Sequence, residues 1–268
     1  MKIIVFGGGL GNQIFGYAFF RYLTGKGKRV YGVYNKRWLN EHHGLELNTV
    51  FEVNLPPSTI GASIVSIVLF LLKKIGLCKN RIDMGTRTFN PNAIVYHGCK
   101  ANKRFIPDGN NWIKFKDIAL NEKNQEVLEK IRSSNSVFIH VRKGDYLSDR
   151  YRTLYEGTCP LIYYRNALAL IEKNIANPNY FVFSDDIEWT KENIVLTNAT
   201  YIYWNTGTES YIDMFLMSNC KAGIMANSTF SFWGAKLGCE KQVVTYPEKW
   251  INTSDGAPDI FPDSWFKL

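Results

Sequence analysis

The sequence lacks several features that would assign it to a broad class. It has no run of five or six like charges and its basic residues are scattered, so a nucleic-acid-binding surface is not indicated. No apolar stretch is long enough to span a bilayer. The start, Met1 to Phe6, is too short for the apolar core of a signal peptide. We therefore expect a cytoplasmic protein that is not secreted and binds no nucleic acid.

Paired metal-binding and redox motifs are also missing. Asp-x-Asp does not occur, and Asp186-Ile187-Glu188 is only a loose substitute, so no metal or other cofactor is expected. The cysteines form an odd set without the close pairs of a zinc or thioredoxin-like motif. They are typical of reduced thiols in a cytoplasmic protein, at Cys78, Cys99, Cys159, Cys220 and Cys239.

The composition is that of a folded globular protein. Hydrophobic residues make up 46% and aromatic residues 15% of 268 residues, a length that suits one large or two small domains. We favour two. The formal charge of +8 suggests an anionic partner, which could be a nucleotide, a nucleic acid or an acidic membrane. Charge alone does not choose among them.

The first residues alternate in the α/β manner. A strand at 2–6 leads through a glycine turn into a helix that begins near Asn12, a plausible N-cap, and a second strand follows at 29–33. The turn does not match a dinucleotide fingerprint, because its third glycine and the ribose-binding acid are missing. It is either a ligand contact or a plain tight turn. From 35 to 120 the pattern is too weak to assign a topology.

The second half of the chain has a regular βαβ pattern. A charged helix at 121–132 looks like the crossover into a second domain, which places the boundary after residue 125. Strands and helices then alternate, which predicts a parallel sheet with helices on both faces. Strands are expected at 136–141, 180–183, 201–203, 222–226 and 242–246, and helices at 160–175, near 188, at 209–218 and at 230–238.

Three polar strings directly follow apolar strands in this half. They are Arg142-Lys143-Gly144-Asp145, Ser184-Asp185-Asp186 and Asn227-Ser228-Thr229. If the strands are parallel neighbours, all three strings lie at the carboxyl edge of one sheet, where open α/β sheets bind their ligands. The sequence therefore predicts an anion-binding site there.

Each string has a functional and a structural interpretation. Arg142 offers a planar fork of donors that fits phosphate oxygens, whereas Lys143 is a point charge. Asp145 would orient a basic neighbour or accept a proton. The alternative for this string is a solvated Arg-Asp turn. The strings at 184–186 and 227–229 either bind ligand or only cap the helices that follow.

One segment, 60–72, is almost wholly apolar and is followed by Lys73-Lys74. It is either a buried helix or an apolar surface with a basic edge that rests on a membrane and meets a lipid-linked acceptor.

Taken together, the strings resemble the alpha-1,2-fucosyltransferases of glycosyltransferase family 11. The resemblance runs from GGGLGNQIFGYA (7–18) through HVRKGDY (140–146) and FSDD (183–186) to DMFLMSNCKAGIMANSTFSFWGAKL (213–237). It implies a GT-B fold of two Rossmann-like domains with parallel sheets facing a central cleft. It also implies GDP-fucose as donor, a terminal galactoside as acceptor, inversion and no metal. Residues 1–125 would be the acceptor-side domain and 126–268 the GDP-fucose-binding domain.

The resemblance also suggests roles for individual residues. Arg142 matches an arginine that grips the donor diphosphate, and His140 and Asp185 match positions near the guanine. Lys143 stands where the family usually has a second arginine. The remaining donor-binding candidates come from the strings and the amino-terminal turn: Ser184, Asn227, Ser228, Thr229 and Asn12.

The predicted reaction is transfer of L-fucose from GDP-fucose to the 2-hydroxyl of a terminal galactoside, in the synthesis of O-antigen or another surface glycan. Arg142 would stabilise the departing phosphate, and Asp145 is the candidate base. A nicotinamide-dependent oxidoreductase and a non-catalytic glycan-binding module are the alternatives.

Overall fold

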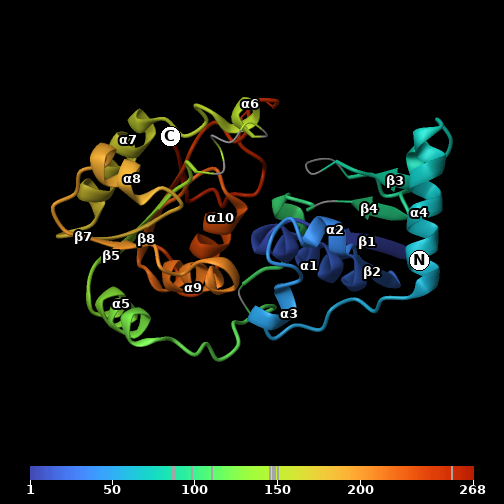
Figure 1. Cartoon of the computed structure of the whole chain (residues 1–268), viewed down its shortest axis with the longest axis horizontal. Helices are drawn as coiled ribbons and strands as arrows, with labels where there is room; N and C mark the ends of the chain where they lie inside the picture. Colours follow the sequence, from blue (N-terminus) through green and yellow to red (C-terminus); the bar gives the residue numbers. More distant parts are fainter. Residues whose placement is uncertain are drawn as a thin grey trace. The chain divides into compact units, whose positions relative to one another are not determined.

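The computed structural model describes residues 1–85, 89–97, 99–109, 111–144, 146, 149, 151–254 and 256–268. The chain divides into two compact units (Figure 1). The first contains residues 1–116 and 258–260, and the second contains 117–257 and 261–268. The boundary expected after residue 125 would fall inside helix α5 (Glu122–Ser133), which packs on strand β5 and helix α9 and so belongs wholly to the second unit.

The N-terminal unit is built on a four-stranded parallel sheet with the order β2-β1-β4-β3. Helix α1 (Leu10–Gly25) covers one face and helix α4 (Ile60–Lys74) the other. Alternating side chains of β1 explain the two layers, because Ile3 and Val5 pack with α4 while Phe6 meets α1 at Gly16. The strands are β1 (Lys2–Phe6), β2 (Val30–Tyr34), β3 (Ile82–Asp83) and β4 (Val95–His97).

The glycine turn after β1 differs in detail from the prediction. Helix α1 begins at Leu10 with Gly9 as its N-cap, so the prediction that Asn12 caps it is wrong. Asn12 already lies in the first helical turn, where its backbone N–H donates to the Gly9 carbonyl at 2.9 Å. The side chain of Gln13 is fully buried and bonds to the backbone of Gly8, Gly44, Glu46 and Leu47. Gln13 therefore stabilises the turn.

The weakly patterned stretch from 35 to 120 supplies much of this unit. It contains the short helices α2 (Lys36–Leu39) and α3 (Leu47–Val50), helix α4, strands β3 and β4, and the 3-10 turns η1 (Lys79–Arg81) and η2 (Lys103–Phe105). A buried ion pair joins its parts, with Lys100 Nζ 2.8 Å from Asp83 Oδ1. Because β3 and β4 are only two and three residues long, their sequence carries little alternation.

Helix α4 is not the buried helix that one interpretation of 60–72 predicted. The helix forms, with Thr59 as its N-cap, but only Ala62 and Ser66 are buried along it. Most of its isoleucine and leucine side chains are exposed to solvent. Within the described ranges, no helix is both long enough and apolar enough to cross a membrane.

The C-terminal unit carries a six-stranded sheet with the order β10-β9-β8-β5-β6-β7, in which every recorded strand pair is parallel. Helices α7 and α8 lie over one face, and α5, α9 and α10 over the other (Figure 1). The strands are β5 (Ser136–Val141), β6 (Asn179–Ser184), β7 (Ala199–Ile202), β8 (Ala222–Ile224), β9 (Val243–Tyr246) and β10 (Phe266–Lys267). The helices are α6 (Arg152–Tyr155), α7 (Leu161–Asn174), α8 (Ile187–Asn193), α9 (Tyr211–Asn219) and α10 (Thr229–Lys236), with the 3-10 turn η4 (Gly207–Glu209) before α9.

The central strand β5 separates two cores. Val137, Ile139 and Val141 pack under α7. Because side chains alternate along a strand, Phe138 and His140 face the other layer. Gly223 on the adjacent strand β8 makes room for Phe138, since a Cβ at Gly223 would lie only 2.1 Å from that ring. The predicted α/β class, with two Rossmann-like units on parallel sheets as a GT-B protein requires, is confirmed.

Candidate functional site

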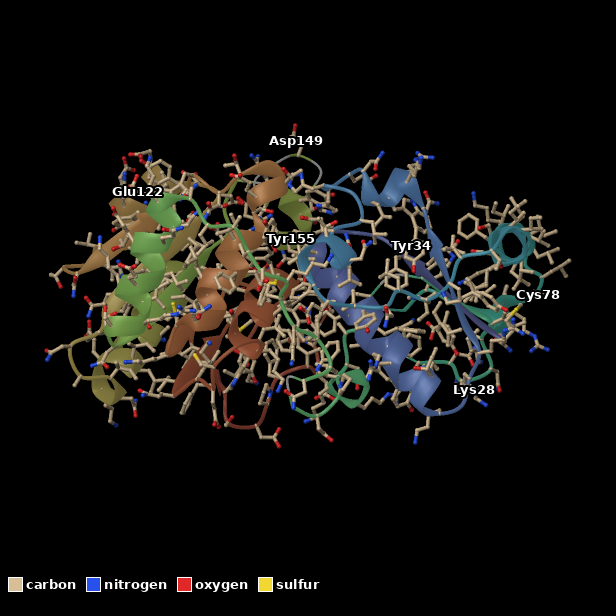
Figure 2. All side chains as sticks on the ribbon, turned by 90° about the horizontal axis from the view of Figure 1, so that it is seen from below. Lys28, Tyr34, Cys78, Glu122, Asp149 and Tyr155 are labelled. Carbon is tan, nitrogen blue, oxygen red and sulfur yellow. The ribbon has the colours of Figure 1, made fainter. Side chains whose placement is uncertain are left out.

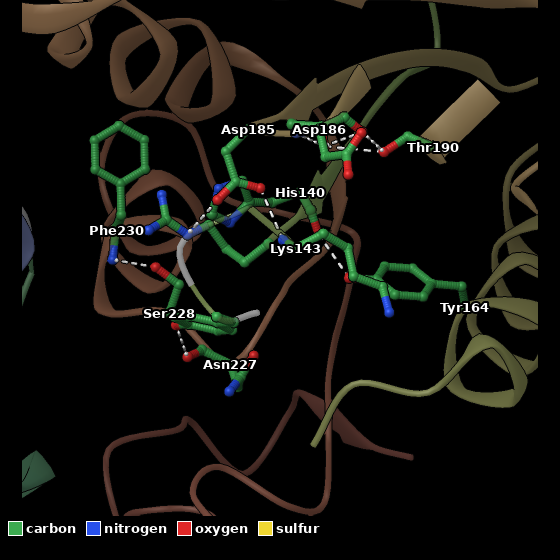
Figure 3. Close-up of polar contacts among 12 residues, drawn as sticks. His140, Lys143, Tyr164, Asp185, Asp186, Thr190, Asn227, Ser228 and Phe230 are labelled. Carbon is green, nitrogen blue, oxygen red and sulfur yellow. Dashed lines mark hydrogen bonds and ion pairs between the residues drawn. The ribbon is translucent and has the colours of Figure 1, made fainter. Parts of the chain in front are cut away.

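The three polar strings follow neighbouring strands. β5 lies between β8 and β6, and its register pairs Val141 with Ser184 on β6 and Ile139 with Ile224 on β8. All three strands run in the same direction, so the strings begin at one edge of the sheet. Figure 3 shows side chains from all three at this edge.

Asp185 ties the string after β6 to the string after β5. Its Oδ1 accepts a hydrogen bond from the backbone N–H of Lys143 at 2.7 Å, and its Oδ2 lies 3.4 Å from Arg142 Nε (Figure 3). Gly144 permits this close approach, because a Cβ there would lie 3.2 Å from the Asp185 carbonyl oxygen. The carboxylate thus orients both the arginine and the backbone beside it.

His140 lies buried at the same edge, with 5% of its surface exposed. Its ring centroid is 5.9 Å from that of Phe230 on α10, and Tyr164 on α7 donates to its backbone carbonyl at 3.1 Å. Burial lowers the His140 pKa to about 3; the Arg142 charge adds to this and the Asp185 charge opposes it. His140 is therefore neutral near pH 7. Its Nδ1 is buried and has no hydrogen-bond partner within the described part of the chain.

The string after β8 opens helix α10. Ser228 is the N-cap, and its Oγ accepts from the Phe230 N–H at 3.2 Å, which places Thr229 at the first helical position. Asn227 is buried and donates through Nδ2 to Thr158 Oγ1 at 2.8 Å and to the Trp250 carbonyl at 2.9 Å. The N-terminus of this helix points partial positive charge out of the sheet edge.

Tyr146 connects the strings after β5 and β8. Its hydroxyl donates to the Asn227 carbonyl at 3.0 Å, and its ring stacks on Tyr155 at 4.2 Å between centroids. The Arg142 guanidinium carbon lies 5.4 Å from the Tyr146 ring centroid, within the range of a cation–π contact. Direct contacts therefore join all three strings into one cluster.

Ser184 and Asp186 take structural roles. Asp186 is the N-cap of α8, and its Oδ1 accepts from the Trp189 N–H at 3.1 Å. The Ser184 hydroxyl bonds to the backbone of Asp186 and to Thr190 Oγ1 (Figure 3). For Asp186, the capping interpretation describes what is observed. A donor contact by Ser184 stays a prediction.

Two candidate residues remain, Asn12 and Asp145. Asn12 is in the N-terminal unit, and its contact with the donor stays a prediction. Asp145, the candidate base, lies outside the described residues. Among the residues that are described, no three His, Cys, Asp or Glu side chains are grouped so that they could hold a metal ion.

Comparison with known sequences identifies the family. The sequence profile of "Glycosyl transferase family 11" matches residues 114–268, which is more than half of the chain and includes all three strings. The chain belongs to glycosyl transferase family 11.

Relatives of this family 11 protein include bacterial and primate enzymes. An alpha-1,2-colitosyltransferase of Escherichia coli is 28% identical over the whole chain and 99% of its own length. The O-antigen biosynthesis glycosyltransferase WbnK of Escherichia coli is 37% identical over 51% of this chain and 45% of its own length. Galactoside alpha-(1,2)-fucosyltransferase 1 of Saimiri boliviensis boliviensis is 31% identical over 44% of the chain and 35% of its own length.

A solved structure, ADP-heptose lps heptosyltransferase II of E. coli, covers the whole chain and 90% of its own length. Its TM-score of 0.44 and sequence identity of 13% are too low to support a conclusion about function.

The profile match confirms the family predicted from the sequence and the glycosyltransferase class. The nicotinamide-dependent oxidoreductase and the non-catalytic module are not favoured, because the match points to a glycosyltransferase.

The geometry also reveals residues of this family 11 site that the sequence reasoning missed. Trp189 on α8 lies 4.2 Å from Lys143 Nζ, measured to its ring centroid, so it takes part in positioning that charge. Phe230 packs against His140, and Tyr146 joins two strings. All three are aromatic residues within four positions of a polar string. This closeness in sequence is the signal by which they could have been found.

Proposed function

We propose that this enzyme transfers L-fucose from GDP-fucose to the 2-hydroxyl of a terminal galactoside, with inversion at the sugar carbon. The observation that carries the proposal is the contact of Asp185 with both Arg142 and the Lys143 backbone, beside the N-terminus of α10. This cluster gathers positive charge at one sheet edge. The relatives named as alpha-1,2-fucosyl- and colitosyltransferases support the linkage and the class of sugar.

The cluster suits the two ends of a nucleoside diphosphate. Arg142, the Ser228 hydroxyl and the N-terminus of α10 are groups of the kind that bind phosphate oxygens. Neutral His140, with Nδ1 buried and unpartnered, offers a hydrogen bond to an uncharged base. Asp185 presents a carboxylate of the kind that accepts from amino and imino groups of guanine.

The chemistry follows from where charge develops. As the bond between fucose and phosphate breaks, negative charge grows on the departing oxygen. Arg142, Lys143 and the start of α10 would stabilise that charge without a metal ion. The acceptor hydroxyl must lose a proton in the same step, and Asp145 is proposed as the base from its place in the sequence.

The proton-transfer proposal has its own test. The pH–rate profile of Asp145→Asn, compared with that of the wild type, should lose its acidic limb. An unchanged acidic limb would remove Asp145 from this role.

A colitosyl donor is the second candidate, because the alpha-1,2-colitosyltransferase matches along the entire chain. Colitose is L-fucose without the 3-hydroxyl, so the same diphosphate site would bind either donor. The two candidates differ only in contacts to that hydroxyl.

The acceptor is proposed to be a galactoside of a bacterial surface glycan such as O-antigen, carried on a lipid. The relative named for O-antigen biosynthesis supports the class of glycan.

A panel of nucleotide sugars tests the function. GDP-fucose and GDP-colitose, with GDP-mannose and UDP-galactose as controls, are incubated with lactose and related galactosides, with and without EDTA. Mass and linkage of the product are then determined. We expect an α-1,2-fucosyl product that EDTA does not diminish. Transfer only from GDP-colitose selects the second candidate. Transfer only from GDP-mannose or UDP-galactose rejects both the fucosyl and the colitosyl proposal.

A further inference from the structure

Helix α4 presents an unusual row of exposed apolar side chains. Ile60, Ile64, Ile67, Val68 and Leu71 recur at intervals of three to four residues, so they share one side of the helix. Their exposed fractions range from 46% for Val68 to 82% for Ile60. Ile75 and Leu77, which follow the helix, are also exposed. We call these seven residues the α4 stripe.

The stripe is a concentration of exposed apolar surface. In the part of the chain that the structure describes, it holds seven of the thirteen exposed large hydrophobic residues. The opposite side of α4 explains how the helix is anchored, because Ala62, Val65 and Leu69 pack on Ile3 and Val5 of β1. The helix therefore does not need the stripe for its own folding. Contiguous exposed apolar surface of this kind marks an interaction site.

Charge around the stripe selects the partner. Between Val53 and Ile82 the sequence has four basic residues, Lys73, Lys74, Lys79 and Arg81, and no acidic residue. All four lie at the C-terminal end of α4 or in the turn that follows it. Lys74 Nζ lies 5.0 Å from the Phe70 ring centroid, so this cation–π contact holds the charge against the helix. Cys78, labelled in Figure 2, begins the turn that carries Lys79 and Arg81.

The length and charge of α4 narrow the choice of occupant. A helix of 15 residues is about 22 Å long, too short to span a bilayer, which takes about 20 residues. An apolar helix side followed by four basic residues and no acidic one matches the acyl chains and phosphate groups at the surface of an anionic membrane.

We propose that α4 binds the surface of an anionic phospholipid membrane, with the stripe inserted among the acyl chains nearest the headgroups and the basic residues against the headgroup phosphates. The helix lies in the plane of the interface, as amphipathic helices with apolar and basic sides do. This binding is independent of the sugar donor and goes beyond the proposed reaction.

Vesicle flotation of the full chain tests the proposal. Vesicles of 70% phosphatidylcholine and 30% phosphatidylglycerol are compared with pure phosphatidylcholine vesicles, at low and at high salt. We expect the protein to float with the anionic vesicles and to float less at high salt, because salt screens the headgroup charge. Failure to float with anionic vesicles, or equal flotation with both vesicle types, would overturn the proposal.

Matched variants assign the binding to the stripe. The triple variant Ile64→Gln, Ile67→Gln, Leu71→Gln should bind at least about 10-fold more weakly, because its apolar insertion is lost. The control Ile162→Gln, Val195→Gln changes two exposed apolar residues of the C-terminal unit and should bind like the wild type. All three proteins should show the same thermal melting, since the changed side chains are exposed. Equal binding by the triple variant would contradict the proposal.

Charge variants test the basic end. Lys74→Gln with Lys79→Gln should weaken binding to anionic vesicles by about 5-fold for each lysine. The control pair Lys28→Gln with Lys130→Gln removes the same charge from other exposed positions and should have less effect. Light scattering after gel filtration tests whether the stripe instead joins two copies of the chain. A stable dimer that the triple variant converts to a monomer would show that the stripe is an interface between copies, which also overturns the proposal.

Discussion

The Asp185 carboxylate accepts a hydrogen bond from the Lys143 N–H at 2.7 Å, across two neighbouring strands. Its second oxygen lies 3.4 Å from Arg142 Nε. One side chain from the turn after β6 thereby fixes the start of the loop after β5. This relationship makes Asp185 a positioning residue for Arg142 as well as a candidate contact for the base of the donor.

Asp185→Asn separates these contributions. The asparagine Oδ1 can still accept from the Lys143 N–H, but the negative charge beside Arg142 is lost. We expect kcat to fall about 10-fold because Arg142 is less well oriented, with little change in melting temperature. Steady-state kinetics with GDP-fucose measure the effect.

Asp186→Asn is the matched control, since Asp186 caps α8 and its replacement can still accept from the Trp189 N–H. Its kcat should stay near the wild-type value. If both variants lost activity equally, the special position of Asp185 would be refuted.

Tyr146→Phe removes the hydrogen bond to the Asn227 carbonyl and leaves the ring stacked on Tyr155. We expect the free energy of unfolding to fall by about 1 kcal/mol, because the Asn227 carbonyl loses its donor. Urea denaturation measures this. Tyr203→Phe, at an exposed tyrosine, is the control and should leave stability unchanged. Equal stability of Tyr146→Phe and wild type would show that this contact does not join the strings.

Asp213 on α9 gives a pH-dependent contribution to stability. Burial raises its pKa from 3.8 to about 7, and the hydrogen bond from Asn205 Nδ2 at 2.7 Å partly opposes this. The folded state then binds the proton more tightly than the unfolded state does. This difference in proton binding adds to the free energy of unfolding. The contribution is complete below pH 3.8 and is lost as the pH rises to about 7.

Asp213→Asn should remove this dependence. At pH 8 we expect the variant to be about 2 kcal/mol more stable than the wild type, less than the full shift implies because Asp213 keeps partial exposure to water. At pH 4 the advantage should vanish. Chemical denaturation at both pH values measures it, and a variant less stable than the wild type at pH 8 would contradict the interpretation.

His140 makes the protein less stable at low pH, which is the opposite pH dependence to that of Asp213. Its pKa of about 3 in the folded protein lies below the ordinary 6.5, so its contribution is complete above pH 6.5 and is lost as the pH falls toward 3. His140→Gln should therefore lose less stability than the wild type between pH 6.5 and 4. Tyr203→Phe, at an exposed position, is the control and should follow the wild-type curve. Parallel curves for all three proteins would show that His140 is not buried in its neutral form.

The C-terminal unit could be predicted from the sequence almost element by element. Its strands β5 to β9 are short, largely apolar runs bounded by turns, so the sequence pattern indicates their positions. Strand β10 has only two residues, both exposed, and was not expected. The strand expected at 136–141 and the one observed coincide. Because parallel strands end at one edge, the grouping of His140, Arg142, Asp185 and Ser228 could be predicted as well.

The N-terminal unit could not be predicted to the same extent. β3 and β4 are too short to show a period, and the ion pair of Asp83 with Lys100 joins residues that no local pattern relates. Helix α4 was expected from its apolar run, but the run could not reveal which side packs on β1. Which side of α4 is exposed depends on how the helix packs on the sheet, and the local sequence does not show this packing.

Binding of GDP, measured by isothermal titration calorimetry for wild type, Arg142→Ala and Arg165→Ala, tests the central claim most directly. Arg165 is exposed on α7 and belongs to none of the three polar strings, so its replacement makes the same change of charge in the same unit. We predict that Arg142→Ala binds GDP at least about 10-fold more weakly than the wild type, because charge-assisted hydrogen bonds to the diphosphate are lost. Arg165→Ala should bind like the wild type. Wild-type affinity for GDP in Arg142→Ala would contradict the claim that this edge of the sheet binds the donor diphosphate.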